Sequence, residues 1–221
     1  MQEPFSYQLS EKVSTLLKDN VEGHVHFDPY TRGRYSTDAS IYQIAPFGVV
    51  VPKTTQDLVS AVEIAAEHNI PILSRGGGTS QCGQTVNEAI VIDCSQYLNK
   101  IVNFDHENMR ISVEPGIVLD HLNSYLKPHN LFFPVDISTA SRATIGGMTA
   151  NNSCGGRSIR YGIMVDNVHA IDALLINGEH ARFSDTPSDI RHIDGTKYYR
   201  QLVSSVTVSY THLRAHETTR Y

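Results

Sequence analysis

The spacing of apolar side chains predicts one helix near the start of the chain, followed by a polar segment. Apolar residues recur on one face between residues 5 and 17, as in an amphipathic helix. Residues 28–40 are polar and rich in Tyr, Arg, Ser and Thr. We therefore expect residues 1–45 to form an N-terminal helix and an extended arm, with the arm at residues 28–40 outside the core.

A strand, a helix and a second strand are predicted next. Residues 48–51 are a β-branched run that Pro52 ends, which is typical of a buried strand. Thr54 can cap the first turn of a helix whose apolar residues follow at helical spacing. Residues 70–73 form the next predicted strand. This order of elements indicates an α/β fold.

Hairpins and one more helix are predicted further along the chain. Residues 89–93 favour a strand, and residues 101–113 favour a hairpin. Leucines at helical spacing between residues 119 and 126 predict a helix that Pro128 ends. Asn177-Gly178, with apolar runs on both sides, is typical of a two-residue hairpin turn.

Composition narrows the function classes. The chain of 221 residues is 40% apolar and 19% charged, with a net charge of −5, so it can bury a normal core. Its basic residues form no stripe, so we expect no nucleic-acid partner. The three cysteines, Cys82, Cys94 and Cys154, contain no Cys-x-x-Cys pair. We therefore expect no disulfide, no cysteine-ligated metal site and a cytoplasmic protein. The N-terminal sequence MQEPFSYQLSEK lacks a basic region followed by an apolar stretch, and the apolar runs are strand-sized, so we also expect no signal peptide and no transmembrane segment.

Three consecutive glycines follow the strand at residues 70–73, in the sequence Ser74-Arg75-Gly76-Gly77-Gly78-Thr79-Ser80. Glycines let successive backbone N–H groups converge, and such a nest of amides can bind phosphate oxygens. Thr79 and Ser80 would add hydroxyl donors, and Arg75 a positive charge. The alternative is a flexible surface turn. No Walker-type Gly-Lys-Ser/Thr occurs, and Gln81 stands where a Rossmann fingerprint needs glycine.

A second cluster of small residues lies between residues 143 and 156, in the sequence ATIGGMTANNSCGG. Small side chains permit a backbone to approach a flat or extended ligand closely. Asn151 and Asn152 supply amide donors and acceptors. The alternative is a surface for tight helix packing.

Together the two clusters resemble the FAD-binding domain of the p-cresol methylhydroxylase and vanillyl-alcohol oxidase superfamily. The resemblance rests on the order VVVP, PILSRGGGTS, GQTV, ATIGGM and NN, followed by Tyr161-Gly162 and Asp166. Within that superfamily the chain is most similar to large bacterial D-2-hydroxyglutarate and D-lactate dehydrogenases, which join an FAD domain to an iron–sulfur domain. Residues 34–42 are similar to theirs as well, and the similarity runs from about residue 20 to about residue 200.

The resemblance implies a role for each matching residue. One group would hold the FAD pyrophosphate, a second would lie near the isoalloxazine, a third would line the other wall, and one residue would lie at the adenine end. These are, in that order, Arg75, Gly76, Gly77, Gly78, Thr79, Ser80, Gly83 and Gln84; Pro134, Asp136 and Thr139; Thr144, Gly146, Gly147, Asn151, Asn152, Gly155 and Tyr161; and Val168.

The resemblance also implies the domain organisation, a mixed α+β or α/β fold. Residues 46–185 would form the FAD-binding domain, in two subdomains of about 46–97 and 98–185, truncated before the substrate domain. Residues 186–207 would begin a further segment. Residues 208–221 resemble a translated sequencing adapter, so we expect a non-native tail; the alternative is a genuine polar terminus.

The activity implied is oxidation of a small D-2-hydroxy acid, with hydride transfer to flavin. Catalytic residues, and any iron–sulfur cluster, would lie downstream of this chain, so no catalytic residue is assigned, and the electron acceptor is not predicted. We expect FAD to be held without a covalent bond, because Thr79 and Arg142 stand where covalent relatives carry His and Cys. The alternatives are a reductase of the same fold that uses FAD with NADPH, and a flavin-binding module without turnover.

Overall fold

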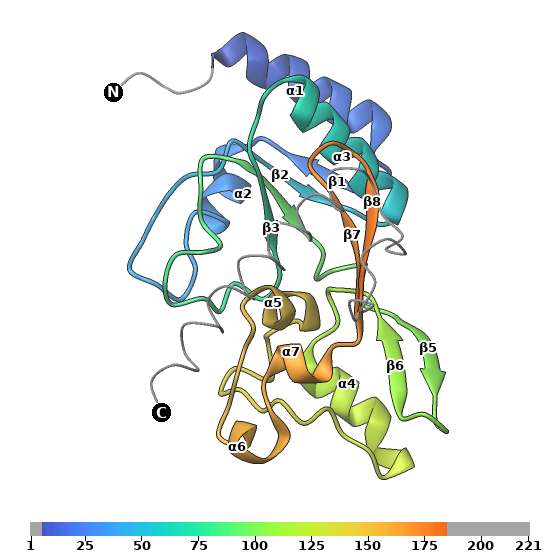
Figure 1. Cartoon of the computed structure of the whole chain (residues 1–221). Coiled ribbons are helices and arrows are strands. Elements are labelled where there is room, and N and C mark those ends of the chain that lie inside the picture. The colour runs from blue at the N-terminus through green and yellow to red at the C-terminus, as the bar shows by residue number, and fades with distance from the viewer. Residues whose placement is uncertain (1–5, 185–221) are drawn as a thin grey trace, which may run out of the picture. The chain divides into compact units, whose positions relative to one another are not determined.

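The computed structural model describes residues 6–184 (Figure 1). The chain divides between Asn167 and Val168 into two compact units, which are described separately. The predicted tail at residues 208–221 and the segment at 186–207 lie outside the described residues.

A four-stranded sheet forms the core of the first unit, in the order β1-β2-β4-β3. β2 (Gly48–Val51), β4 (Ile90–Asp93) and β3 (Ile72–Arg75) run parallel, and β1 (His24–His26) pairs antiparallel with β2 at one edge. Every residue of β2 and β4 is buried, as expected for parallel strands covered on both faces. The predicted strands are confirmed, with β3 shifted by two residues toward the glycines.

Two helices, α1 (Tyr7–Asn20) and α3 (Thr55–Glu67), lie side by side against this sheet (Figure 1). Thr54 caps α3 as predicted, because its side chain accepts a hydrogen bond from the N–H of Asp57. The carboxylate of Asp57 is buried and accepts hydrogen bonds from the N–H groups of Glu22, Gly23 and Lys53 at 2.8–3.0 Å. This one side chain therefore joins α3 to the connections before and after it.

The prediction of an extended arm at residues 28–40 is wrong for its first part, residues 29–34. Residues Pro29–Arg34 form a short helix, α2, because Asp28 caps its first turn and Pro29 occupies a position where no N–H is needed. Thr31 and Ser36 are buried, so this segment also contributes to the packed interior. Within the predicted arm, residues 35–40 have no regular structure, apart from an isolated bridge that Thr37 forms with Gln43.

The remainder of the first unit carries the second glycine cluster. β5 (Ile101–Asp105) and β6 (Arg110–Val113) form the predicted hairpin, and α4 (Leu119–Leu126) follows with its three leucines buried. The 3-10 helix η1 (Lys127–His129) contains Pro128. The short helix α5 (Ile145–Ala150) lies within the cluster, and two more short helices, α6 (Ser158–Tyr161) and α7 (Met164–Asn167), follow it in the chain.

The described part of the second unit is a hairpin of β7 (Ala170–Leu174) and β8 (His180–Ser184). The hairpin predicted from Asn177-Gly178 is confirmed, but its turn differs from the two-residue form. The N–H of Gly178 donates to the Leu175 carbonyl at 2.9 Å, and Gly178 adopts a φ of 81°. The connection is thus a longer turn that places only the glycine in the left-handed region.

Candidate functional site

The triple-glycine loop begins where β3 ends, at the carboxyl edge of the parallel strands. Gly78 has a φ of 63°, a conformation that side chains with a Cβ rarely adopt. The backbone N–H groups of residues 77–81 donate to no acceptor among residues 6–184. These five amides, with the hydroxyls of Thr79 and Ser80, fit a ligand that carries several anionic oxygens, such as a pyrophosphate.

The two glycine clusters predicted from the sequence are in direct contact. A Cβ added to Gly76 would collide with the Thr144 hydroxyl, and one added to Gly77 would collide with the carbonyl group of Arg142. The glycines are therefore required for the close approach of two protein segments, in addition to any ligand. A hydrogen bond of 2.9 Å between the side chains of Gln84 and Asn151 also joins the two clusters.

The start of the second cluster is held by its own capping interactions. Thr144 is 2% exposed, and its hydroxyl accepts from the N–H of Gly147 at the start of α5. Gly146 lies against Pro115, where a Cβ would be 2.6 Å from the proline side chain. The Thr139 carbonyl accepts from two N–H groups just ahead of α5, at 2.8 and 2.9 Å. These contacts fix the backbone that faces the first glycine loop.

Asp136 lies at the centre of a second set of contacts. A Cβ on Gly155 would overlap the Asp136 backbone, and the N–H of Arg157 donates to the Asp136 carboxylate at 2.9 Å. Arg157 also forms a 3.7 Å ion pair with that carboxylate and lies over the ring of Phe132. Pro134 precedes this set in the chain, next to Val135, which is 1% exposed. The residues predicted around the isoalloxazine therefore include one tightly packed group.

Two other predicted residues hold the end of the cluster. Asn152 adopts a φ of 46°, and its side-chain oxygen accepts from the N–H of Val165 at 3.0 Å. Tyr161 packs edge-on against Phe132, with ring centroids 5.7 Å apart. Val168 belongs to the second unit, so its predicted place at the adenine end stays a prediction.

Arg75 is placed differently from a simple phosphate partner. Its guanidinium donates to the backbone carbonyls of Tyr35 and Thr85 at 3.2 and 3.1 Å, and to that of Thr37 at 2.8 Å. Sequence reasoning did not single out Thr37 or Thr85, because a backbone carbonyl leaves no signal in the residue type. It also missed the contact of Tyr42 with Gly83, whose φ is 74°.

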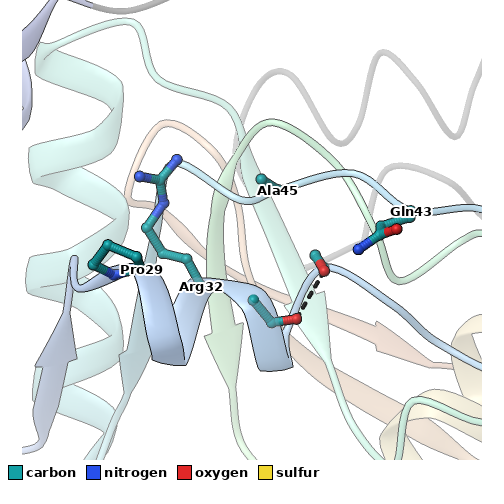
Figure 2. Close-up of a pocket in the computed structure, with 6 residues that line it drawn as sticks. Pro29, Arg32, Gln43 and Ala45 are labelled. Atoms are coloured by element: carbon teal, nitrogen blue, oxygen red, sulfur yellow. Dashed lines mark hydrogen bonds between the residues drawn. The ribbon is translucent and has the colours of Figure 1, made fainter.

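A cavity of about 440 Å³ in the first unit is lined by Pro29, Arg32, Gly33, Ser36, Gln43 and Ala45 (Figure 2), and contains none of the predicted site residues. In it the Ser36 hydroxyl donates to the Gly33 carbonyl, and Arg32 donates to the Pro46 carbonyl. A further cavity, of about 720 Å³, lies between α4 and the segment from Asn130 to Asp136, with Arg157 at its wall.

The other candidate chemistry within residues 6–184 concerns metal ligands, membrane spans and cysteines. Residues 6–184 contain no group of three His, Cys, Asp or Glu side chains that could hold a metal ion. None of the helices within those residues is long and apolar enough to cross a membrane. Cys82 and Cys154 are exposed thiols, whereas burial, with help from Asp93 and Glu114, raises the pKa of the Cys94 thiol to about 11.

The parallel sheet and the two facing glycine clusters lie within one matched family region. Residues 46–184 match the family model described as an FAD binding domain, and the chain belongs to that family. The predicted fold and the predicted cofactor, FAD, are thereby confirmed.

The chain is also similar to two dehydrogenases over 78% of its own length. The chain is 38% identical over 179 residues to D-2-hydroxyglutarate dehydrogenase of Haemophilus influenzae, which is 78% of this chain and 17% of that protein. It is 32% identical over 174 residues to the mitochondrial D-lactate dehydrogenase (cytochrome) of Arabidopsis thaliana, which is 78% of this chain and 30% of that protein. The chain thus spans less than a third of the length of either relative.

Solved structures support the fold. An alkyldihydroxyacetonephosphate synthase structure superimposes with a TM-score of 0.67 at 21% identity, over 83% of this chain and 35% of that one. At this identity the likeness concerns the fold alone.

Proposed function

We propose that this chain is the FAD-binding part of a dehydrogenase that oxidises a D-2-hydroxy acid, with D-2-hydroxyglutarate favoured over D-lactate. The observation that carries the proposal is the 38% identity to a D-2-hydroxyglutarate dehydrogenase over 179 residues. Over a stretch of similar length, identity to a D-lactate dehydrogenase is 32%. The free thiols Cys82 and Cys154 also favour a reducing compartment, so we include a cytoplasmic location in the proposal.

In this proposal the first glycine loop binds the pyrophosphate of FAD. The amides of residues 77–81 are the donors, because no acceptor within the described chain uses them. Thr79 and Ser80 add hydroxyl donors beside them. Gly76 and Gly77 bring this loop against Arg142 and Thr144, so that the second cluster forms the opposite wall.

FAD, when bound, supplies the chemistry by accepting a hydride from the α-carbon of the substrate. The described residues bind and orient the cofactor. The packed group around Asp136 fixes one backbone segment that the resemblance places next to the flavin ring. The resemblance implies an acid/base group in the rest of the enzyme, so this proposal assigns no proton-transfer role to a residue of this chain.

Flavin reduction in the full-length protein tests the proposal. The purified protein, loaded with FAD, would be mixed anaerobically with D-2-hydroxyglutarate, D-lactate, their L-enantiomers or NADPH, and the loss of flavin absorbance followed. We expect D-2-hydroxyglutarate to bleach the flavin fastest, D-lactate to do so more slowly, and the L-enantiomers and NADPH to have no effect. Bleaching by NADPH alone would instead identify a reductase, and no bleaching by any compound would favour a binding module without turnover.

A further inference from the structure

The segment from Tyr35 to Tyr42, which we call the brace, is fastened to the glycine loop at several points. Arg75, just before the glycines, donates to two brace carbonyls, those of Tyr35 and Thr37, at 3.2 and 2.8 Å. The same guanidinium donates to the Thr85 carbonyl, just after the loop, at 3.1 Å. One side chain therefore joins the brace to both ends of the segment 76–84 that carries the free amides.

Two further contacts strengthen this connection. The Thr85 hydroxyl donates to the Asp38 carboxylate at 2.9 Å, and Tyr42 packs so closely on Gly83 that a Cβ there would be 2.6 Å from its ring. Burial raises the pKa of Asp38, but hydrogen bonds from Ser40 and Thr85 outweigh it, and the net pKa is lowered. The carboxylate is therefore ionised at neutral pH and can accept both bonds.

The brace is anchored to the sheet as well. The Tyr35 hydroxyl donates to the carboxylate of Asp93, at the end of β4, over 2.6 Å. Asp93 is 8% exposed and pairs across the strands with Arg75. The guanidinium of Arg75 also lies 5.1 Å from the centre of the Tyr35 ring. The brace thus has a fixed position against the strand ends from which the glycine loop emerges.

We propose that Arg75 is a positioning residue: by tying the brace to both ends of the loop, it sets the spacing of the amides at residues 77–81, and it does not bind the pyrophosphate itself. The proposal rests on FAD being held at this loop. A guanidinium offers five N–H donors in a rigid fork, and here three of the five donate to backbone carbonyls on both sides of the loop. Gly78 lies directly on this group, since a Cβ there would be 2.6 Å from a guanidinium nitrogen.

Lysine separates the two roles of Arg75, because it keeps the charge but cannot reproduce the fork. A phosphate partner would tolerate Arg75→Lys and lose affinity with Arg75→Gln, whereas a positioning residue would fail in both variants. Arg34→Lys, in the exposed last turn of α2, is the matched control.

The test combines hydrogen exchange in the FAD-free protein with ligand titrations. In both Arg75 variants we expect the amide of Ile44, which donates to the brace carbonyl of Ser36 at 2.9 Å, to exchange faster by about tenfold or more, while amides of α3 do not change. Dissociation constants for FAD and for ADP should both rise by about tenfold. Arg34→Lys should match the wild type in each measurement.

Several results would overturn the proposal. One is an Arg75→Lys variant that binds FAD normally while Arg75→Gln does not; another is a brace that exchanges at the wild-type rate in both. Faster exchange with unchanged FAD affinity would also refute it. If the wild type bound no FAD, the proposed function would fail, but exchange in the FAD-free protein would still decide whether Arg75 holds the brace.

A milder substitution covers the case in which the Arg75 variants do not fold. Thr85→Val removes only the hydroxyl that reaches Asp38, and Thr15→Val, which removes a hydroxyl bonded within α1, is its control. Thr85→Val should speed brace exchange and weaken FAD binding, and Thr15→Val should do neither. Equal behaviour of the two variants would count against the brace.

Discussion

Replacing Gly77 by alanine should separate the two glycine clusters. The added Cβ would lie 2.9 Å from the carbonyl carbon of Arg142, and closer still to its oxygen, whereas real Cβ atoms essentially never come within 3.0 Å of another heavy atom. Both atoms belong to the backbone, so no side chain can rotate out of the way. The segments must move apart, and overpacking of this kind costs about 1–3 kcal/mol.

The same movement should weaken FAD binding, because the amides of residues 77–81 would no longer face the second cluster at the native spacing. We expect the dissociation constant for FAD to rise at least about tenfold, which corresponds to about 1.4 kcal/mol. The FAD-free protein should also melt at a lower temperature, by about 2–4 °C for each kcal/mol in a domain of this size. The effect thus begins with the protein's own backbone and does not require a clash with the ligand.

Fluorescence titration with FAD and thermal melting of the FAD-free protein measure the two effects. Gly156→Ala is a matched control in the second cluster, because the nearest atom to its added Cβ is 3.8 Å away, in the Asp136 side chain. The control should bind FAD as the wild type does. A Gly77→Ala variant with wild-type melting temperature and wild-type FAD affinity would refute the contact described here.

Three further predictions concern stability and the flavin linkage. Asp57→Ala should lower the free energy of unfolding in urea by about 3 kcal/mol or more, because three N–H groups lose their charged acceptor, whereas exposed Asp19→Ala should change it little. Burial raises the pKa of Asp57, but its hydrogen bonds outweigh this and the net pKa is lowered. Its stabilisation should therefore be complete above the unfolded-state pKa of about 3.9 and be lost as the pH falls below it, so the urea midpoints of wild type and Asp57→Asn should converge in acid. FAD should be released when the loaded protein is precipitated with acid, because Thr79 cannot form a covalent bond to the flavin. Flavin fluorescence that stays with the denatured chain would contradict non-covalent binding.

The elements that could be predicted from the sequence are those whose signals are local. β2, α3 and the hairpin at Asn177-Gly178 each follow from a few adjacent residues that bury one face or cap one turn. The short helix α2 was missed because its polar residues hide a capping signal that Asp28 and Pro29 carry.

The site was predictable in composition but not in its contacts. The two glycine clusters were recognised from their residue types, yet the packing of Gly77 on Arg142 joins positions 65 residues apart and depends on the tertiary fold. Arg75 was assigned to the phosphate because a charge next to glycines suggests an anion. Its three partners are backbone carbonyls, which any residue provides, so the sequence could not indicate them.

The most direct test of the central claim is to observe the loop amides while FAD binds. In a ¹⁵N-labelled sample of the 221-residue chain, the amide resonances of residues 77–81 would be followed by NMR during titration with FAD and, separately, with ADP. We predict that these resonances shift together and in the same direction with both ligands, because both carry the pyrophosphate. FAD binding that leaves the five amides unchanged would show that the triple-glycine loop is not the phosphate site.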